Sequence, residues 1–168
     1  MTLASLDQQD TLAKTLLSSC REGQLSICCA ESLTGGLLAD AFVRVPGASD
    51  VFLGSVNTYA VRTKTRILGV DANFLEANGP VNAYTAEQMA LGALRVFGCD
   101  GIALSTTGVA GPGPDGDISA GTFYVACALS DGRVMSEKHY CADAAREEVR
   151  RCAVSSALRL GSAQFMVQ

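Results

Sequence analysis

Histidine is nearly absent from this sequence, since His139 is the only one among 168 residues. A Ser-His-Asp triad would have to use His139, which lies in a predicted edge strand and is interpreted as structural. The seven cysteines form no C-x-x-C pair, and a single histidine adds little to any set of zinc ligands. The sequence therefore predicts no metal site and no other cofactor.

Long apolar runs and basic clusters are also missing. No run reaches the length that a bilayer-spanning helix needs, and residues 1–10 lack the basic and apolar regions of a signal peptide. We therefore expect a cytoplasmic protein that does not bind membranes. The net charge of −4, without any cluster of Lys and Arg, argues against nucleic acid as a partner.

The composition indicates a compact globular protein, with 48% hydrophobic and 18% charged residues. We expect one domain over residues 1–168, with its core at about 6–160. Cys28, Cys29 and Cys127 lie in apolar surroundings, so the cysteines are interpreted as reduced core thiols. Exposed apolar surface on so hydrophobic a chain favours a homo-oligomer.

Hydrophobic periodicity predicts alternating helices and strands along the chain. We predict strands at 25–30, 51–59 and 101–105, a hairpin of strands at 121–129 and 133–141, and helices at 6–21, 37–45, 62–68, 71–78, 83–97 and 144–160. This order predicts an α/β fold, a three-layer α/β/α sandwich with a mixed sheet.

Two turns that combine hydroxyl side chains with glycine follow predicted strands. The first is residues 30–36, Ala-Glu-Ser-Leu-Thr-Gly-Gly, and the second is residues 106–108, Thr-Thr-Gly. If the two strands are parallel neighbours, the turns meet at the sheet edge where α/β proteins bind ligands. Ser32 would then face a helix N-terminus able to hold a phosphate or an oxyanion, with Gly35 and Gly36 permitting close approach. The alternative is that Ser32 or Thr34 merely caps the helix.

A nucleophilic serine needs a base, and lysine, a carboxylate or tyrosine must serve where histidine is scarce. Lys64 follows Tyr59 by five residues, just past a predicted strand, so both side chains can point into one cleft. The alternatives are a solvated lysine and a tyrosine that packs on the sheet. Thr107 could be a turn former, and Arg146 and Arg150 could form a charged helix face.

These segments together resemble one family. In chain order they are residues 30–36 (AESLTGG), 46–49 (PGAS), Tyr59 with Lys64, 68–70 (LGV), 107–112 (TGVAGP) and 121–122 (GT). The pattern resembles the CinA C-terminal domain family, also known as nicotinamide-nucleotide amidohydrolases. The resemblance covers residues 6–160, and the chain looks like the stand-alone form, without a molybdopterin-binding-like domain.

The resemblance implies a three-layer α/β fold that hydrolyses the carboxamide of nicotinamide mononucleotide. The products would be nicotinate mononucleotide and ammonia, in pyridine nucleotide recycling. Ser32 matches the family's nucleophile, Lys64 the residue that activates it, and Tyr59 and Thr107 complete the expected catalytic set. The residues expected to bind this nucleotide are Thr34, Gly35, Gly36, Gly108, Ala110, Gly111, Pro112 and Arg146. Arg146 is assigned to the phosphate, because a guanidinium suits phosphate oxygens, and a Ser-Lys pair needs no metal.

Three segments depart from the family pattern, namely residues 60–62, residues 144–145 and the short loop at 113–120. They leave open an alternative, a non-catalytic relative that binds a nucleotide or a partner protein. Phosphoryl transfer ranks last, because the chain lacks the G-x-x-x-x-G-K-[ST] loop that cradles a triphosphate.

Overall fold

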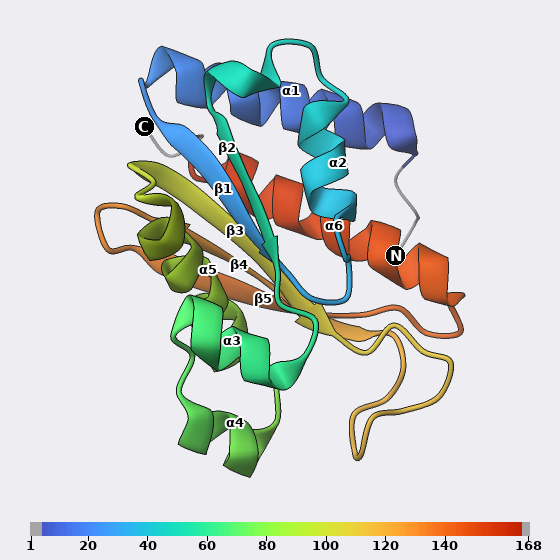
Figure 1. The fold of residues 1–168 in the computed structure, drawn as a ribbon. Coiled ribbons are helices and arrows are strands. Elements are labelled where there is room, and N and C mark those ends of the chain that lie inside the picture. The colour runs from blue at the N-terminus through green and yellow to red at the C-terminus, as the bar shows by residue number, and fades with distance from the viewer. Residues whose placement is uncertain (1–4, 166–168) are drawn as a thin grey trace.

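The computed structural model describes residues 5–165, which form six α-helices, a short 3-10 helix and a five-stranded sheet (Figure 1). In chain order the elements are α1 (Leu6–Glu22), β1 (Ser26–Glu31), α2 (Leu37–Val43), η1 (Ala48–Asp50), β2 (Phe52–Asn57), α3 (Val61–Leu68), α4 (Ala72–Asn78), α5 (Ala83–Phe97), β3 (Gly101–Gly108), β4 (Thr122–Leu129), β5 (Val134–Tyr140) and α6 (Arg146–Ala163). None of the helices in this span is both long and apolar enough to cross a bilayer.

The sheet has the strand order β2-β1-β3-β4-β5 and is mixed. β1 runs parallel to β2 and to β3, whereas β4 is antiparallel to both β3 and β5. In the β1–β3 register Ala30 pairs with Ser105 and Glu31 with Thr106. The carboxyl ends of β2, β1 and β3 therefore meet at one edge of the sheet, as the sequence predicts for the two hydroxyl-containing segments.

Helices cover both faces of the sheet. Helices α1, α2 and α6 lie on one face, and α5 with α3 lies on the other (Figure 1). A separate hydrophobic core lies on each face of the sheet. In β1, Ile27 and Cys29 belong to one of these cores, and Cys28 and Ala30 belong to the other. Side chains of a strand alternate between faces, so a strand covered on both sides must be apolar throughout. The predicted three-layer α/β fold is confirmed.

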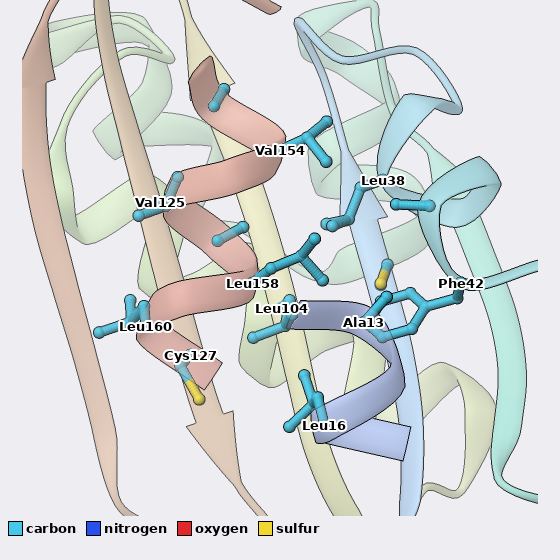
Figure 2. Packing of buried hydrophobic residues seen from close by; sticks show 14 of the residues in the cluster. Ala13, Leu16, Leu38, Phe42, Leu104, Val125, Cys127, Val154, Leu158 and Leu160 are labelled. Atoms are coloured by element: carbon cyan, nitrogen blue, oxygen red, sulfur yellow. The ribbon is translucent and has the colours of Figure 1, made fainter. Parts of the chain in front are cut away.

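The larger core lies between α6 and the sheet (Figure 2). Leu158 of α6 packs with Leu16 of α1 and Phe42 of α2 above Leu104 and Val125 of the sheet, and all five side chains are fully buried. Burying a side chain of this size stabilises the fold by about 1.5–3 kcal/mol. The core therefore fixes α6 and α2 relative to the strands, and with them the segments at the sheet edge.

The cysteines belong to these cores. All seven lie within the described residues, where each is buried and unpaired. Burial raises the pKa of Cys20 and of Cys127 to about 12, so these thiols stay protonated near neutral pH. This agrees with their interpretation as core thiols.

The prediction of a turn at residues 106–108 is wrong. β3 does not end at Ser105 but continues to Gly108, because Thr107 pairs with Tyr124 and Gly108 with Phe123 of the antiparallel neighbour β4. The second hydroxyl-containing segment is therefore part of a strand, and its position at the sheet edge is fixed by backbone pairing.

Helices α5 and α3 approach each other closely at Gly92. A Cβ atom at Gly92 would lie 2.3 Å from the carbonyl oxygen of Leu68, the last residue of α3. The same carbonyl accepts a hydrogen bond from Arg95 Nη2 at 2.9 Å. Only glycine permits this approach, so Gly92 allows α3 to pack directly against α5.

We expect Gly92→Ala to lower the free energy of unfolding by about 1–3 kcal/mol, because the added methyl group must push α3 away. Urea denaturation followed by circular dichroism measures this. Gly23→Ala is the matched control: its φ is −80° and its Cβ would meet nothing closer than 3.4 Å. Equal unfolding free energies for Gly92→Ala and the wild type would contradict this close packing of α5 against α3.

Candidate active site

A cavity of about 360 Å³ opens at the edge of the sheet where β1 and β3 end. Its volume is within the range of small-molecule sites. The residues that line it are Ser32, Leu33, Tyr59, Val61, Lys64, Pro80, Val81, Thr107, Gly108, Val109, Ala110, Gly111, Pro112, Gly113, Pro114, Asp115 and Arg146. The structure thus brings together the four residues expected to be catalytic and most of those expected to bind substrate.

Ser32 and Lys64 form a buried pair in this cavity. Lys64 Nζ lies 2.9 Å from Ser32 Oγ and 2.5 Å from the carbonyl oxygen of Thr58, and donates to both in its charged form. Ser32 follows β1 directly, and its N–H donates to the carbonyl of Thr106 at 3.0 Å, which extends the parallel pairing by one residue. Lys64 lies on the buried side of α3 and is only 1% exposed. The alternative of a solvated lysine is therefore wrong.

Burial lowers the pKa of Lys64 to about 8, because removal from water penalises the ammonium form. Near neutral pH about a tenth of the molecules then carry a neutral amine at this position. A neutral amine 2.9 Å from a hydroxyl is placed to accept its proton.

A buried carboxylate holds the segment that follows β1. Glu31 is only 1% exposed and lies at the N-terminal end of α2. Its Oε2 accepts hydrogen bonds from Thr34 Oγ1, Gly36 N and Leu38 N, and its Oε1 from Ala39 N and Ser55 Oγ. These distances are 2.7–3.0 Å. Free N–H groups at a helix N-terminus favour an anion, and here the protein supplies its own.

Thr34, Gly35 and Gly36 consequently do not line the cavity. Thr34 is fully buried, and its hydroxyl group contacts Glu31 and Thr106. Gly36, in the left-handed region at φ 106°, is the N-cap of α2, and its N–H donates to Glu31. The capping alternative for Ser32 also fails, since Ser32 Oγ contacts Lys64 and the N–H groups at the start of α2 are bound by Glu31.

Three segments meet at the mouth of the cavity. Arg146, the first residue of α6, donates to the carbonyl of Gly111 and to the hydroxyl oxygen of Tyr59, the latter at 3.3 Å. Tyr59 is 65% exposed, so it forms part of the rim and does not pack on the sheet. The loop that follows β3 projects beside the N-terminal end of α6 (Figure 1). Because Arg146 also lines the cavity, its guanidinium is accessible to a ligand.

Thr107 has a different environment from that of Ser32. It is buried and lines the cavity, but its hydroxyl group donates to the carbonyl of Pro80 at 2.7 Å. This bond joins β3 to the segment before α5, and so holds the wall formed by Pro80 and Val81. In the structure the Thr107 hydroxyl therefore binds a backbone segment of the cavity wall.

Some residues of the site carry no clear sequence signal. Val61, Pro80 and Val81 form apolar wall, and apolar residues in connecting segments are common in any fold. Asp115 lies in the glycine-rich loop, where aspartate is an ordinary turn residue. Arg150, for which a charged helix face was the alternative, donates to the carbonyls of Leu33 and Thr34. Only the tertiary structure reveals that contact.

The fold and the site define a class: a three-layer α/β domain with a buried serine–lysine pair in a ligand-sized cavity at the sheet edge. The chain belongs to the CinA C-terminal domain family, whose model matches residues 9–164. A CinA-like protein from Frankia casuarinae is 40% identical over 151 residues, which cover 90% of this chain and 34% of that protein. The chain spans about a third of the length of the curated relatives that it matches.

Solved structures of the family share the whole fold. The competence/damage inducible protein CihA from Agrobacterium tumefaciens matches with a TM-score of 0.87 and 31% identity, covering 95% of this chain and 96% of that one. A CinA superfamily protein from Escherichia coli matches with a TM-score of 0.88 and 28% identity, covering 99% of this chain and 95% of that one. These comparisons confirm the family resemblance and the fold expected from the sequence.

Proposed function

We propose that this chain is an amidohydrolase that converts nicotinamide mononucleotide to nicotinate mononucleotide and ammonia. The observation that carries the proposal is the 2.9 Å contact between Lys64 Nζ and Ser32 Oγ, inside a cavity of about 360 Å³. A hydroxyl group beside a desolvated lysine is the arrangement that activates a serine without histidine. The substrate is suggested by the family that the motif residues resemble.

The reaction would proceed through an acyl-enzyme. Neutral Lys64 takes the proton of Ser32 as Oγ attacks the carboxamide carbon, and the resulting ammonium gives that proton to the departing nitrogen. Ammonia leaves, and nicotinate mononucleotide remains joined to Ser32 as an ester. Lys64 then deprotonates a water molecule, which cleaves the ester, and the proton returns to Ser32.

Negative charge develops on the amide oxygen in both steps and needs a hydrogen-bond donor. Gly36 N–H is occupied by Glu31, so it does not serve. Leu33, the residue after the nucleophile, lines the cavity, and within residues 5–165 its N–H donates to no protein acceptor. Leu33 N–H is therefore the proposed donor, in the position that nucleophile turns use in α/β-hydrolases.

The remaining walls suit a pyridine nucleotide. Val61 and Val81 offer apolar contact to a flat ring, and Tyr59 offers an aromatic face at the rim. Arg146 supplies a guanidinium at the mouth, where the phosphate would lie if the carboxamide reaches Ser32. This arrangement supports Arg146 as a residue that binds substrate and takes no part in the bond-breaking steps.

Removal of either member of the pair should abolish ammonia release from nicotinamide mononucleotide. Ser32→Ala, Lys64→Ala and the double variant should show similarly small rates in single-turnover assays, because nucleophile and base act as one unit. Lys14→Ala is the control, since Lys14 is an exposed lysine of α1. Near-normal turnover by Ser32→Ala would exclude the acyl-enzyme, and inactive wild-type protein would favour a non-catalytic binding role.

The rate should rise with pH. The base form of Lys64 is required and its pKa is about 8, so kcat/KM should increase through pH 8 and level off above it. At pH 7 we expect about a tenth of the plateau value. Initial rates of ammonia release between pH 6 and 10, with substrate binding measured separately, test this. A flat profile would rule out Lys64 as the base.

Arg146→Ala should weaken the binding of the nucleotide far more than the binding of the phosphate-free nucleoside. Loss of a charge-assisted contact to phosphate should raise KM for nicotinamide mononucleotide by about 10-fold or more. The same variant assayed with nicotinamide riboside serves as the internal control. Equal losses on both substrates would show that Arg146 acts through its contacts to Gly111 and Tyr59 and not through the phosphate.

A further inference from the structure

Arg150 of α6 binds the backbone immediately after the proposed nucleophile. Its Nε donates to the carbonyl of Leu33 at 2.9 Å, and its Nη2 donates to the carbonyl of Thr34 at 2.7 Å. Its Nη1 donates to Glu147 Oε2 at 2.8 Å. The fixed fork of a guanidinium thus binds two successive carbonyl groups, one and two residues beyond Ser32.

This contact holds two carbonyl groups of a short stretch. Its other bonds are those of the Thr34 hydroxyl to Glu31 and Thr106, and a bond from Leu37 N to the Thr34 carbonyl at 3.3 Å. Before it, Ser32 N–H is bound to β3, and after it, Glu31 binds the backbone from Gly36 onward. The backbone carbonyls of Leu33 and Thr34 lie between these two anchors, and both are directed at α6. The side chain of Arg150 is 25% exposed, so its hydrogen bonds are partly shielded from water.

We propose that Arg150 is a positioning residue for the nucleophile: through the carbonyls of Leu33 and Thr34 it holds the turn that aims Ser32 Oγ at the reacting carbon and the Leu33 N–H at its oxygen. The inference rests on the proposed function for the identity of the nucleophile. Arg150 does not line the cavity, so it acts through the turn and does not touch substrate. A misplacement of about 1 Å at a reacting atom costs about 100-fold in rate, so such a contact is kinetically important.

The neighbouring Arg151 provides a matched control. Arg150 and Arg151 both bind Glu147, Arg151 through Nε at 3.1 Å, but only Arg150 contacts the turn. Arg150→Ala and Arg151→Ala therefore remove the same charge from the same helix and each break one ion pair with Glu147. A difference between the two variants isolates the contacts to Leu33 and Thr34.

Two measurements are made on the full chain of each variant. The first is kcat and KM for ammonia release from nicotinamide mononucleotide. The second is the rate at which a fluorophosphonate probe labels Ser32, followed by intact mass: the Oγ–P bond forms, the P–F bond breaks, fluoride leaves and Lys64 takes the proton. The labelling rate reports on the nucleophile whatever the natural substrate is.

For Arg150→Ala we expect kcat and the labelling rate to fall by about 10- to 100-fold, with KM changed less than about 3-fold. Arg151→Ala should stay within about 2-fold of the wild type, since partly exposed ion pairs contribute little. Millimolar methylguanidinium should restore part of the rate of Arg150→Ala only. Arg150→Lys keeps the charge but cannot bind both carbonyls as a fork, so it should also be slow, which covers the case in which the alanine variant does not fold.

Wild-type kcat and labelling rates in folded Arg150→Ala, or a change in KM alone, would overturn the inference. Equal losses in Arg150→Ala and Arg151→Ala would also overturn it, because the shared ion pairs would then be responsible. If the wild type is labelled but does not release ammonia, the proposed substrate is wrong, and the labelling rates alone decide the role of Arg150. If the wild type is not labelled, Ser32 is not an activated nucleophile, and the positioning role of Arg150 is excluded as well.

Discussion

The buried carboxylate of Glu31 is the constraint on which the site depends. A carboxylate removed from water is costly unless it is fully hydrogen-bonded, and this one accepts five hydrogen bonds. Its donors come from the turn after β1, from the first turn of α2 and from Ser55 of β2, while Thr34 links the cluster to Thr106 of β3. One charge therefore fixes three strands and a helix around the backbone that carries Ser32.

The same carboxylate determines where an external anion can bind. A helix N-terminus beside a strand end is a common phosphate site, but at α2 its free N–H groups are already bound to Glu31. Positive charge that lines the cavity is instead supplied by Arg146, at the start of α6. The nucleophile and this guanidinium thus line the same cavity but come from different elements, the turn after β1 and the start of α6.

Local signals predicted much of the fold. The pattern predicts helix α5 at 83–97 and the structure has these bounds; its N-cap is Asn82, whose Oδ1 accepts from Thr85 N. The apolar run predicts β1, and its parallel pairing with β3 is the condition under which the two hydroxyl-containing segments meet, which the structure fulfils. Patterns of this kind involve only residues that are close together in the chain, so they can be recognised from the sequence.

Other features depend on distant partners and could not be read locally. Residues 106–108 look like a turn because they combine two threonines with a glycine, yet pairing with β4 makes them strand. Gly36 was expected at a ligand, but the carboxylate that occupies its N–H comes from five residues earlier. Arg150 acts on a segment 116 residues away. Ser32 and Lys64 are 32 residues apart, and the residues alone left a solvated Lys64 open; the family resemblance is what assigned the two as nucleophile and base.

The glycine- and proline-rich loop after β3 bears on how this site evolves. Residues 112–117 are exposed, yet Pro112, Gly113, Pro114 and Asp115 line the cavity. The serine, the lysine and the carboxylate beneath them lie instead on elements anchored in the two cores. Substitutions in this loop change the surface that a substrate meets while leaving the core packing intact. Selection can therefore alter which molecules are accepted without first having to restore a weakened fold.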